Sequence, residues 1–339
     1  MLNREKNKIT YLHFILSVLV ILIHSINNET KVEQFFSIEK GIGQFAVPLF
    51  FIISGFLFFR NIYTTNDVKQ KIRKRVYTLL IPYLIWNLIY YALYMLRNPG
   101  MGLDVAQIID AAFNYTYNPS FWFMYQLILL IVISPILFFA LQENKFIVIF
   151  LVLMTCSIIF EIDLPYINED AIIYYFVGAV FSKLYNKNHI SFINKKNFIF
   201  ALLFSILAFI LNRWTYRMIY VNINFRTIFI WTTILVRLFA GFTIFYFIDL
   251  LFKYEKVFSF MENTFFLYAL HYMIVRAIII GMRNVEYKFL TIVPNNIIEI
   301  LEIIVFFISP VVCVCINYYL SRYLKKKYSK VYYYLSGNR

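Results

Sequence analysis

The sequence predicts an all-α polytopic integral membrane protein, and three observations lead to this fold class. Apolar residues make up 61% of the 339-residue chain and charged residues only 15%, whereas soluble proteins contain about 45–50% and about 25%. The mean hydropathy is +0.69. The apolar residues also form runs of about 20, the length that crosses a bilayer as a helix. The interior of a water-soluble protein of this size could not bury this much apolar surface.

Ten apolar segments are candidates for transmembrane helices. They are residues 9–26, 44–60, 77–97, 121–141, 146–161, 171–186, 197–212, 227–251, 258–281 and 297–321. Polar residues 27–30 follow the first segment without a small-x-small cleavage site, so we expect a retained helix and not a signal peptide. The predicted organisation is a cytosolic N-terminus (1–8), a membrane domain (9–324) and a basic cytosolic tail (325–339).

The distribution of basic residues predicts the orientation. The net charge is +14, and a chain this apolar leaves no room for a soluble nucleic-acid-binding domain. With the N-terminus inside, 22 of the 32 Lys and Arg residues fall in inner segments, 8 in outer segments and 2 within spans. Cytosolic loops of membrane proteins carry this excess. We therefore predict that both termini lie inside and that the number of spans is even.

Ionisable residues inside predicted spans mark a polar interior, because such residues are costly in a bilayer and are usually functional. His24 and His271 lie in the first and ninth spans, and Arg237 and Arg276 in the eighth and ninth. His13 precedes His24 by eleven residues, so both side chains point to the same side of a helix. Neutral imidazole is a proton acceptor near neutral pH. This set favours a catalyst or a transporter over a passive anchor.

Four further features have a structural and a functional interpretation. The loop at residues 69–75 is either a topological signal or, through Arg73 and Arg75, a site for a phosphate-rich cytosolic ligand. Pro48, Ser54 and Gly55 in the second span are typical of a kink and of close helix packing. Trp122 begins the fourth span and could be an interface residue. Cys156, Cys313 and Cys315 lack metal-ligand spacing, so no metal site is expected.

Six segments, in this order, resemble the integral membrane acyltransferase family 3. They are YLHFILSVLVILIHS (11–25), VPLFFIISGF (47–56), RKRVYTLLIPYLIW (73–86), FWFMYQLILLIVISP (121–135), FVGA (176–179) and SFMENTFFLYALHYMI (259–274). The resemblance covers roughly residues 8–320 and places the family's helix-1 histidine on His24 and its late histidine on His271. It implies a bacterial cytoplasmic membrane protein with ten spans.

What the resemblance implies is transfer of an acyl group, often acetyl, from acetyl-CoA or another acyl-CoA to a hydroxyl. The acceptor would be a surface glycan, a lipid-linked sugar or a small molecule, and glycan-assembly proteins are possible partners. His24 or His271 would act as base, and Ser54, Tyr268 or an arginine would stabilise the oxyanion. Arg73 and Arg75 would anchor the phosphates of coenzyme A, and no metal is implied.

One position departs from the family pattern. The family usually carries Arg or Lys eleven positions before its helix-1 histidine, where this chain has His13. His13 could supply a part-time positive charge, Lys8 could partly substitute, or the activity could be divergent. His24 also lies ~22 Å along its helix from the inner face, so the donor must reach deep into the bundle, or His271 must receive the acyl group first. A transporter or exporter of the same fold, or a non-catalytic partner of glycan assembly, is the alternative.

Overall fold

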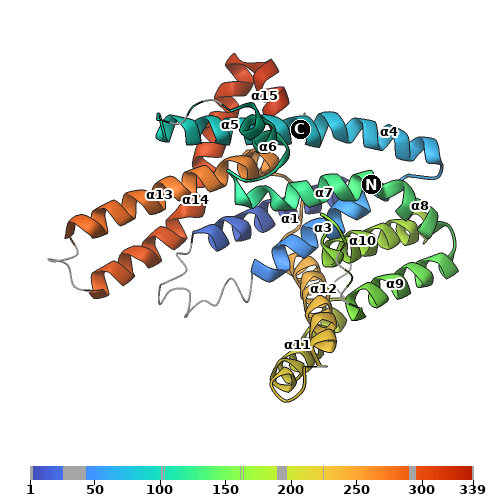
Figure 1. Cartoon of the computed structure of the whole chain (residues 1–339). Helices are drawn as coiled ribbons and strands as arrows, with labels where there is room; N and C mark the ends of the chain where they lie inside the picture. The colour runs from blue at the N-terminus through green and yellow to red at the C-terminus, as the bar shows by residue number, and fades with distance from the viewer. Residues whose placement is uncertain are drawn as a thin grey trace. The chain divides into compact units, whose positions relative to one another are not determined.

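The computed structural model describes residues 3–25, 43–100, 102, 104–160, 162, 164–188, 197–223, 225–289 and 295–337. Throughout these residues the regular structure is helical, and no strand occurs in them (Figure 1). The all-α fold class is therefore confirmed. Lys31, Lys40, Lys195, Lys196 and Arg339, which entered the charge count, lie outside the described residues.

The chain forms two compact units, and each is described by itself. The first comprises Met1–Leu12, Gln44–Ile72 and Leu129–Lys256, and the second comprises His13–Gly43, Arg73–Ile128 and Val257–Arg339. Three of the boundaries between them, after residues 12, 72 and 128, fall within helices, which are α1 (Asn3–His24), α4 (Thr65–Arg75) and α7 (Trp122–Val132).

The first unit contains α3 (Gly43–Phe59), α8 (Ser134–Gln142), α9 (Asn144–Ile159), α10 (Glu169–Asn188), α11 (Asn197–Ile219) and α12 (Phe225–Leu251). Helices α11 and α12 run side by side (Figure 1). Exposed apolar side chains cover much of α11, among them Phe200, Leu203, Phe204 and Leu207. A helix that is apolar on its exposed side is typical of a lipid-facing span.

Glycine makes the closest helix contact in this unit, between α3 and α10. A Cβ added at Gly55 would collide with the carbonyl oxygen of Tyr175, and one added at Gly178 would collide with that of Ile52. Each glycine therefore admits the backbone of the opposite helix, which is the role that small residues have between membrane helices. The predicted close packing at Gly55 is confirmed.

The second unit contains a π-helical segment (Val76–Leu80), α5 (Ile81–Arg97), α6 (Val105–Phe113), a 3₁₀ turn (Pro119–Phe121), a second 3₁₀ turn (Ser259–Met261), α13 (Thr264–Phe289), α14 (Asn295–Lys327) and α15 (Ser329–Ser336). Helices α13 and α14 lie side by side, and α15 lies against α5 (Figure 1). The Trp86 indole donates to Leu335 O at 3.0 Å. The ring centre of the buried Tyr332 lies 5.8 Å from that of Phe266. Helix α15 is thus packed onto the unit.

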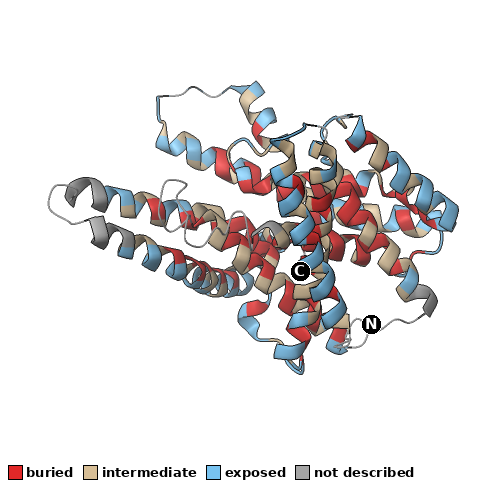
Figure 2. Cartoon of the chain, turned by 90° about the horizontal axis from the view of Figure 1, so that it is seen from below, coloured by how far each residue is buried: buried red, intermediate tan, exposed pale blue. Residues whose placement is uncertain are grey.

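Each of the ten predicted spans overlaps a helix in the described residues, and buried and exposed residues intermingle along these helices (Figure 2), but ten membrane crossings are not confirmed. Among the described residues, six helices are long and apolar enough to cross a membrane: Asn3–His24, Thr65–Arg97, Asn197–Ile219, Phe225–Leu251, Thr264–Asn284 and Ile300–Lys327. The predicted fourth span becomes a seventh if α7 and α8, which meet at 55°, are one broken span. Helices α3 and α9 have only 17 and 16 residues, and α10 is not among the long apolar helices.

The break between α7 and α8 has a local cause. Pro135 lies in the first turn of α8, where it has no N–H for the preceding turn. The Ser134 hydroxyl donates to Leu130 O at 2.9 Å and accepts or donates at 3.2 Å with Tyr175. The sequence predicts one continuous helix over 121–141, and the proline divides it.

The prediction of a loop at residues 69–75 is wrong, because these residues form the end of α4. Thr64 begins the helix with a capping box: its hydroxyl accepts from the Asp67 N–H at 3.2 Å, and Asp67 accepts from the Thr64 N–H at 2.8 Å. Such reciprocal bonds satisfy free amides at a helix N-terminus. Helix α4 then continues through the π-helical segment into α5. Arg73 and Arg75 therefore lie on a helix.

Candidate active site

The two histidines expected to take part in catalysis lie together. The ring centres of His24, at the end of α1, and His271, on α13, are 5.3 Å apart with an interplanar angle of 41°. His271 is completely buried, whereas His24 is half-buried. A pair with one accessible and one enclosed ring has the arrangement that an acid–base site needs, since only the accessible ring must reach substrate.

The tautomer of His271 follows from the hydrogen bond at its Nδ1. Its Nδ1 is bonded to the carbonyl oxygen of Tyr268, one turn earlier on α13. A carbonyl oxygen can only accept, so Nδ1 carries the hydrogen and Nε2 carries a lone pair. Within the described part of the chain, Nε2 has no hydrogen-bond partner. The site therefore contains a buried proton acceptor whose orientation is fixed from behind.

Tyr268 connects this histidine to the segment that precedes α7. Its hydroxyl donates to Ser120 O, and its ring stacks on Phe121 at 5.9 Å and 8°. The phenol proton is thus already used by a backbone carbonyl. Trp122, which the sequence places at the start of a helix, does begin α7 directly after Phe121.

Part of the segment between α5 and α7 packs against α5. It contains α6, whose N-cap Asp104 accepts from Ala106 N–H at 2.9 Å. The Tyr83 hydroxyl donates to Phe113 O at 2.9 Å, and Asn87 Nδ2 donates to Ala112 O at 3.2 Å. The Asp-x-x helix start is a signal for α6, but its packing against α5 required the tertiary structure.

Tyr90 of α5 modifies α13 at the level of His271. Its hydroxyl donates to Ala269 O at 2.9 Å and accepts from Met273 N–H at 3.2 Å. These two backbone groups are hydrogen-bond partners in a regular α-helix, so the hydroxyl bridges them. A side chain inserted in this ladder locally opens a helix. No sequence pattern identified Tyr90 as a residue that supports the site.

Arg276 joins the same cluster through Tyr272. Its Nε donates to the Tyr272 hydroxyl at 3.1 Å, and its guanidinium carbon lies 5.4 Å from the centre of that ring. The Tyr272 ring meets His24 edge-on, with ring centres 5.8 Å apart. The structure therefore brings together four of the predicted residues: His24, Tyr268, His271 and Arg276.

The other predicted residues lie apart from this cluster or in the first unit. Arg73 is exposed and Arg75 is half-buried, both in the last turn of α4. His13 lies on α1 eleven residues before His24, and its carbonyl accepts from Ser17 Oγ at 2.7 Å. Ser54 is half-buried on α3. Arg237 forms an ion pair with Asp170, with Nη1 and Oδ2 2.9 Å apart.

Lys8 does not supply a free positive charge. Its Nζ lies 2.9 Å from Asp249 Oδ2, both side chains are completely buried, and the ammonium sits 3.5 Å from the centre of the Phe245 ring. The Tyr254 hydroxyl donates to the other carboxylate oxygen of Asp249 at 3.0 Å. Asp249 compensates the charge, so Lys8 serves to join α1 to α12. The reasoning that marked Arg237 applies equally to Asp249, which lies in the same apolar run.

Lys71 also has a structural partner. Its Nζ donates to the carbonyl oxygens of Phe58, at 2.6 Å, and Arg60. These carbonyls belong to the last turn of α3 and the residues after it, where helical partners are missing. An ammonium at a helix C-terminus also interacts favourably with the helix dipole. The positive-inside interpretation had not anticipated this contact.

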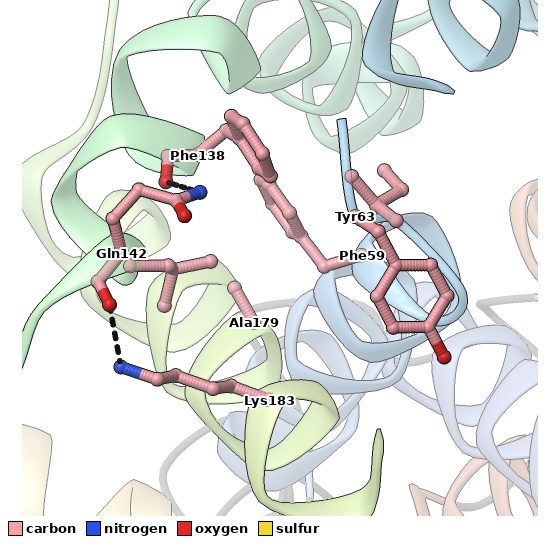
Figure 3. A pocket seen from close by; sticks show the side chains of 8 residues that line it. Phe59, Tyr63, Phe138, Gln142, Ala179 and Lys183 are labelled. Carbon is pink, nitrogen blue, oxygen red and sulfur yellow. Dashed lines mark hydrogen bonds between the residues drawn. The ribbon is translucent and has the colours of Figure 1, made fainter. Parts of the chain in front are cut away.

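A cavity of about 290 Å³ opens in the first unit between α3, α8 and α10 (Figure 3). Its walls are mainly apolar, and the Lys183 ammonium at its edge lies 3.5 Å from Gln142 O and 3.3 Å from Asn144 Oδ1. The lining residues are Phe59, Ile62, Tyr63, Phe138, Leu141, Gln142, Ala179 and Lys183. No imidazole and none of the predicted site residues lines it.

Potential metal ligands are not clustered. No group of three or more His, Cys, Asp or Glu residues that could hold a metal ion occurs within the described ranges. Cys156, Cys313 and Cys315 are free thiols.

Long apolar helices that carry two adjoining imidazoles, one buried and one half-buried, are features of a multi-pass membrane protein with a polar interior. The comparison with known families narrows this class of protein. The model of the acyltransferase domain of family 3 matches residues 6–322, which is nearly the whole chain. The chain therefore belongs to the acyltransferase family 3 and is a membrane acyltransferase. No curated protein and no solved structure matches it.

Proposed function

We propose that this acyltransferase moves an acyl group, acetyl in the simplest case, from a cytosolic acyl-CoA to a hydroxyl of an envelope acceptor. The acceptor class is a surface glycan or a lipid-linked sugar. The contact between His24 and His271 is the observation that carries the proposal, because attack of a hydroxyl on a thioester needs a base near neutral pH. A bound metal is not needed for this chemistry.

In the proposed mechanism His24 is the base and His271 orients it. His271 donates from Nδ1 to the Tyr268 carbonyl, which leaves the Nε2 lone pair available to accept an N–H of His24 during the reaction; the two ring centres are 5.3 Å apart. The other nitrogen of His24 then carries a lone pair and takes the proton of the acceptor hydroxyl. A third group that orients the base is the arrangement common to activated nucleophiles.

The acyl transfer then proceeds through a tetrahedral intermediate. The acceptor oxygen forms a bond to the thioester carbonyl carbon as its proton passes to His24. Collapse of the oxyanion breaks the carbon–sulfur bond, and the His24 imidazolium gives its proton to the leaving coenzyme A thiolate. Tyr268 can donate to the oxyanion only by releasing Ser120 O.

The acyl-CoA binds through Arg73 and Arg75 at the end of α4. Ten spans with both termini inside would place this helix at the cytosolic face, where coenzyme A is found. Guanidinium groups bind phosphate oxygens in pairs, and Arg73 is exposed. Lys71, in contrast, is occupied by the carbonyls at the end of α3.

We place the enzyme in the cytoplasmic membrane of a bacterium, in contact with phospholipid and with glycan-assembly proteins. The acceptor would reach the site from the outer side of the membrane. His13, which stands where relatives carry Arg or Lys, would contribute positive charge only when protonated.

The decisive experiment compares O-acyl groups on the surface glycan of cells that lack the protein and carry either wild type or His24→Ala. We expect the alanine variant to restore none of the modification at equal membrane abundance. Full restoration would exclude His24 as the base.

The donor site is tested with purified protein and acetyl-CoA, by following release of free coenzyme A. Arg75→Ala should raise the KM for acetyl-CoA about tenfold or more, the value of one charge-assisted hydrogen bond. Lys69→Ala, on the same exposed helix, is the matched control. If Arg75→Ala and Lys69→Ala change the KM for acetyl-CoA by the same small factor, Arg75 contributes only to the topology.

A further inference from the structure

Arg276 is held in a fixed orientation without a counter-charge. Its Nε is bonded to the Tyr272 hydroxyl at 3.1 Å, so the plane of the guanidinium is set. Among the described residues, no carboxylate forms an ion pair with it. The side chain is exposed. An uncompensated charge within a predicted span is costly unless an anion or water reaches it.

This guanidinium is close to the proposed base. Tyr272 contacts both groups, with its ring centre 5.4 Å from the Arg276 guanidinium carbon and 5.8 Å from the His24 ring centre. The guanidinium carbon therefore lies within about 11 Å of the His24 ring centre. One molecule the size of a substituted sugar can contact both at once.

We propose that Arg276 binds an anionic group of the acceptor, a phosphate or a carboxylate, and so holds the acceptor hydroxyl at His24. The two free Nη groups present a fork that fits the oxygens of either anion. The proposal rests on the proposed function and narrows it: the acceptor is an acidic saccharide or a phosphate-bearing glycolipid, not a neutral sugar.

The position of Arg276 favours the acceptor over the acyl donor. It follows His271 by five residues, which is about 7.5 Å along a helix. In the proposed topology α13 runs outward, so Arg276 lies on the outer side of the histidines. A donor from the cytosol approaches His271 from the opposite side.

The test is a binding titration with the full chain in phosphatidylcholine nanodiscs. Histidine labelled with ¹³C reports on the site, and the His24 signal is identified by its loss in His24→Gln. Glucose 6-phosphate and glucuronate are the anionic probes and glucose is the neutral one. We expect both anions, but not glucose, to shift the His24 signal.

The variants locate the binding group. Arg276→Gln should weaken binding of the anionic probes about tenfold to a hundredfold, the loss of one charged hydrogen-bonding group. Arg276→Lys should retain part of the affinity. Arg283→Gln, two turns further along α13, is the matched control and should bind as wild type does.

Four results would overturn the proposal: no shift with either anion, an equal shift with glucose, an unchanged affinity in Arg276→Gln, or Arg276-dependent binding of coenzyme A alone. Nanodiscs of phosphatidylglycerol test whether an anionic lipid headgroup occupies the site. If it does, the anionic sugars cause no shift of the His24 signal at any concentration, and this result would also contradict the proposal. Coenzyme A release is measured on the same samples. Anion binding without any release would refute the proposed function and leave this site intact.

Discussion

The buried ion pair between Lys8 and Asp249 allows a quantitative test of how the first unit is held together. The charged atoms are 2.9 Å apart and both side chains are completely inaccessible. At an effective dielectric constant of 20 the attraction is about 6 kcal/mol, and most of it offsets the cost of removing both charges from water. Removing one partner leaves the other charge buried, which destabilises proteins by about 3–5 kcal/mol.

We therefore expect Lys8→Met and Asp249→Leu each to lower the free energy of unfolding by about 3–5 kcal/mol. The double variant should recover most of this loss. About 1–3 kcal/mol should remain, because the buried Tyr254 hydroxyl no longer has Asp249 as its acceptor. The measurement is unfolding in dodecyl maltoside micelles by added SDS, followed by tryptophan fluorescence.

Lys145 provides the matched control. Its ion pair with Glu143 is 2.8 Å long, but the two side chains are 65% and 55% exposed. Lys145→Met should cost less than about 1 kcal/mol. The reasoning is refuted if Lys8→Met and Lys145→Met lower the free energy of unfolding by the same amount. It is also refuted if the double variant is no more stable than the less stable of the two single variants, Lys8→Met and Asp249→Leu.

Three further predictions concern the site, the helix crossing and the chain terminus. His271→Ala should lower kcat by about 10²–10⁴ with little change in the KM for acetyl-CoA, and adding it to His24→Ala should cost almost nothing more, because the two rings act as a unit; additive losses would separate them. Gly178→Ala should destabilise the protein by more than about 2 kcal/mol, whereas Gly281→Ala, where a Cβ meets nothing within 4 Å, should stabilise it by about 0.5–1 kcal/mol; equal unfolding midpoints in SDS would contradict this. Burial raises the pKa of Tyr332 to about 12, so docking of α15 should weaken between about pH 10, where the unfolded phenol ionises, and pH 12. Tyr332→Phe should remove that loss, as read from a dye at the C-terminus, and a loss that persists in it would assign the effect to another group.

The positions of the helices could be predicted because each span is a property of a contiguous run. An apolar run of bilayer length is helical whatever its neighbours, since no other structure satisfies its backbone in lipid. Interruptions were harder to predict. Pro135 was visible, but whether a proline bends or divides a helix depends on what surrounds it, and the capping box at Thr64 was overlooked among charged residues.

The site was predictable only in its residue types. His24 and His271 stood out because ionisable residues are rare in apolar runs. Their contact depends on how α1 and α13 pack, which periodicity does not determine. The supporting residues Tyr90 and Tyr272 were hidden for another reason: the chain has 28 tyrosines, and nothing in the sequence separates these two from the others. Asp249 was missed although the same rule that marked Arg237 identifies it.

The crossing of α3 and α10 places an unusual limit on variation. The atoms that exclude a side chain at Gly55 and Gly178 are main-chain carbonyl oxygens of Tyr175 and Ile52, and every amino acid at those positions has the same carbonyl. A smaller residue opposite therefore cannot make room. In a suppressor screen started from an alanine at Gly178, we expect revertants to glycine and no compensating change at position 52.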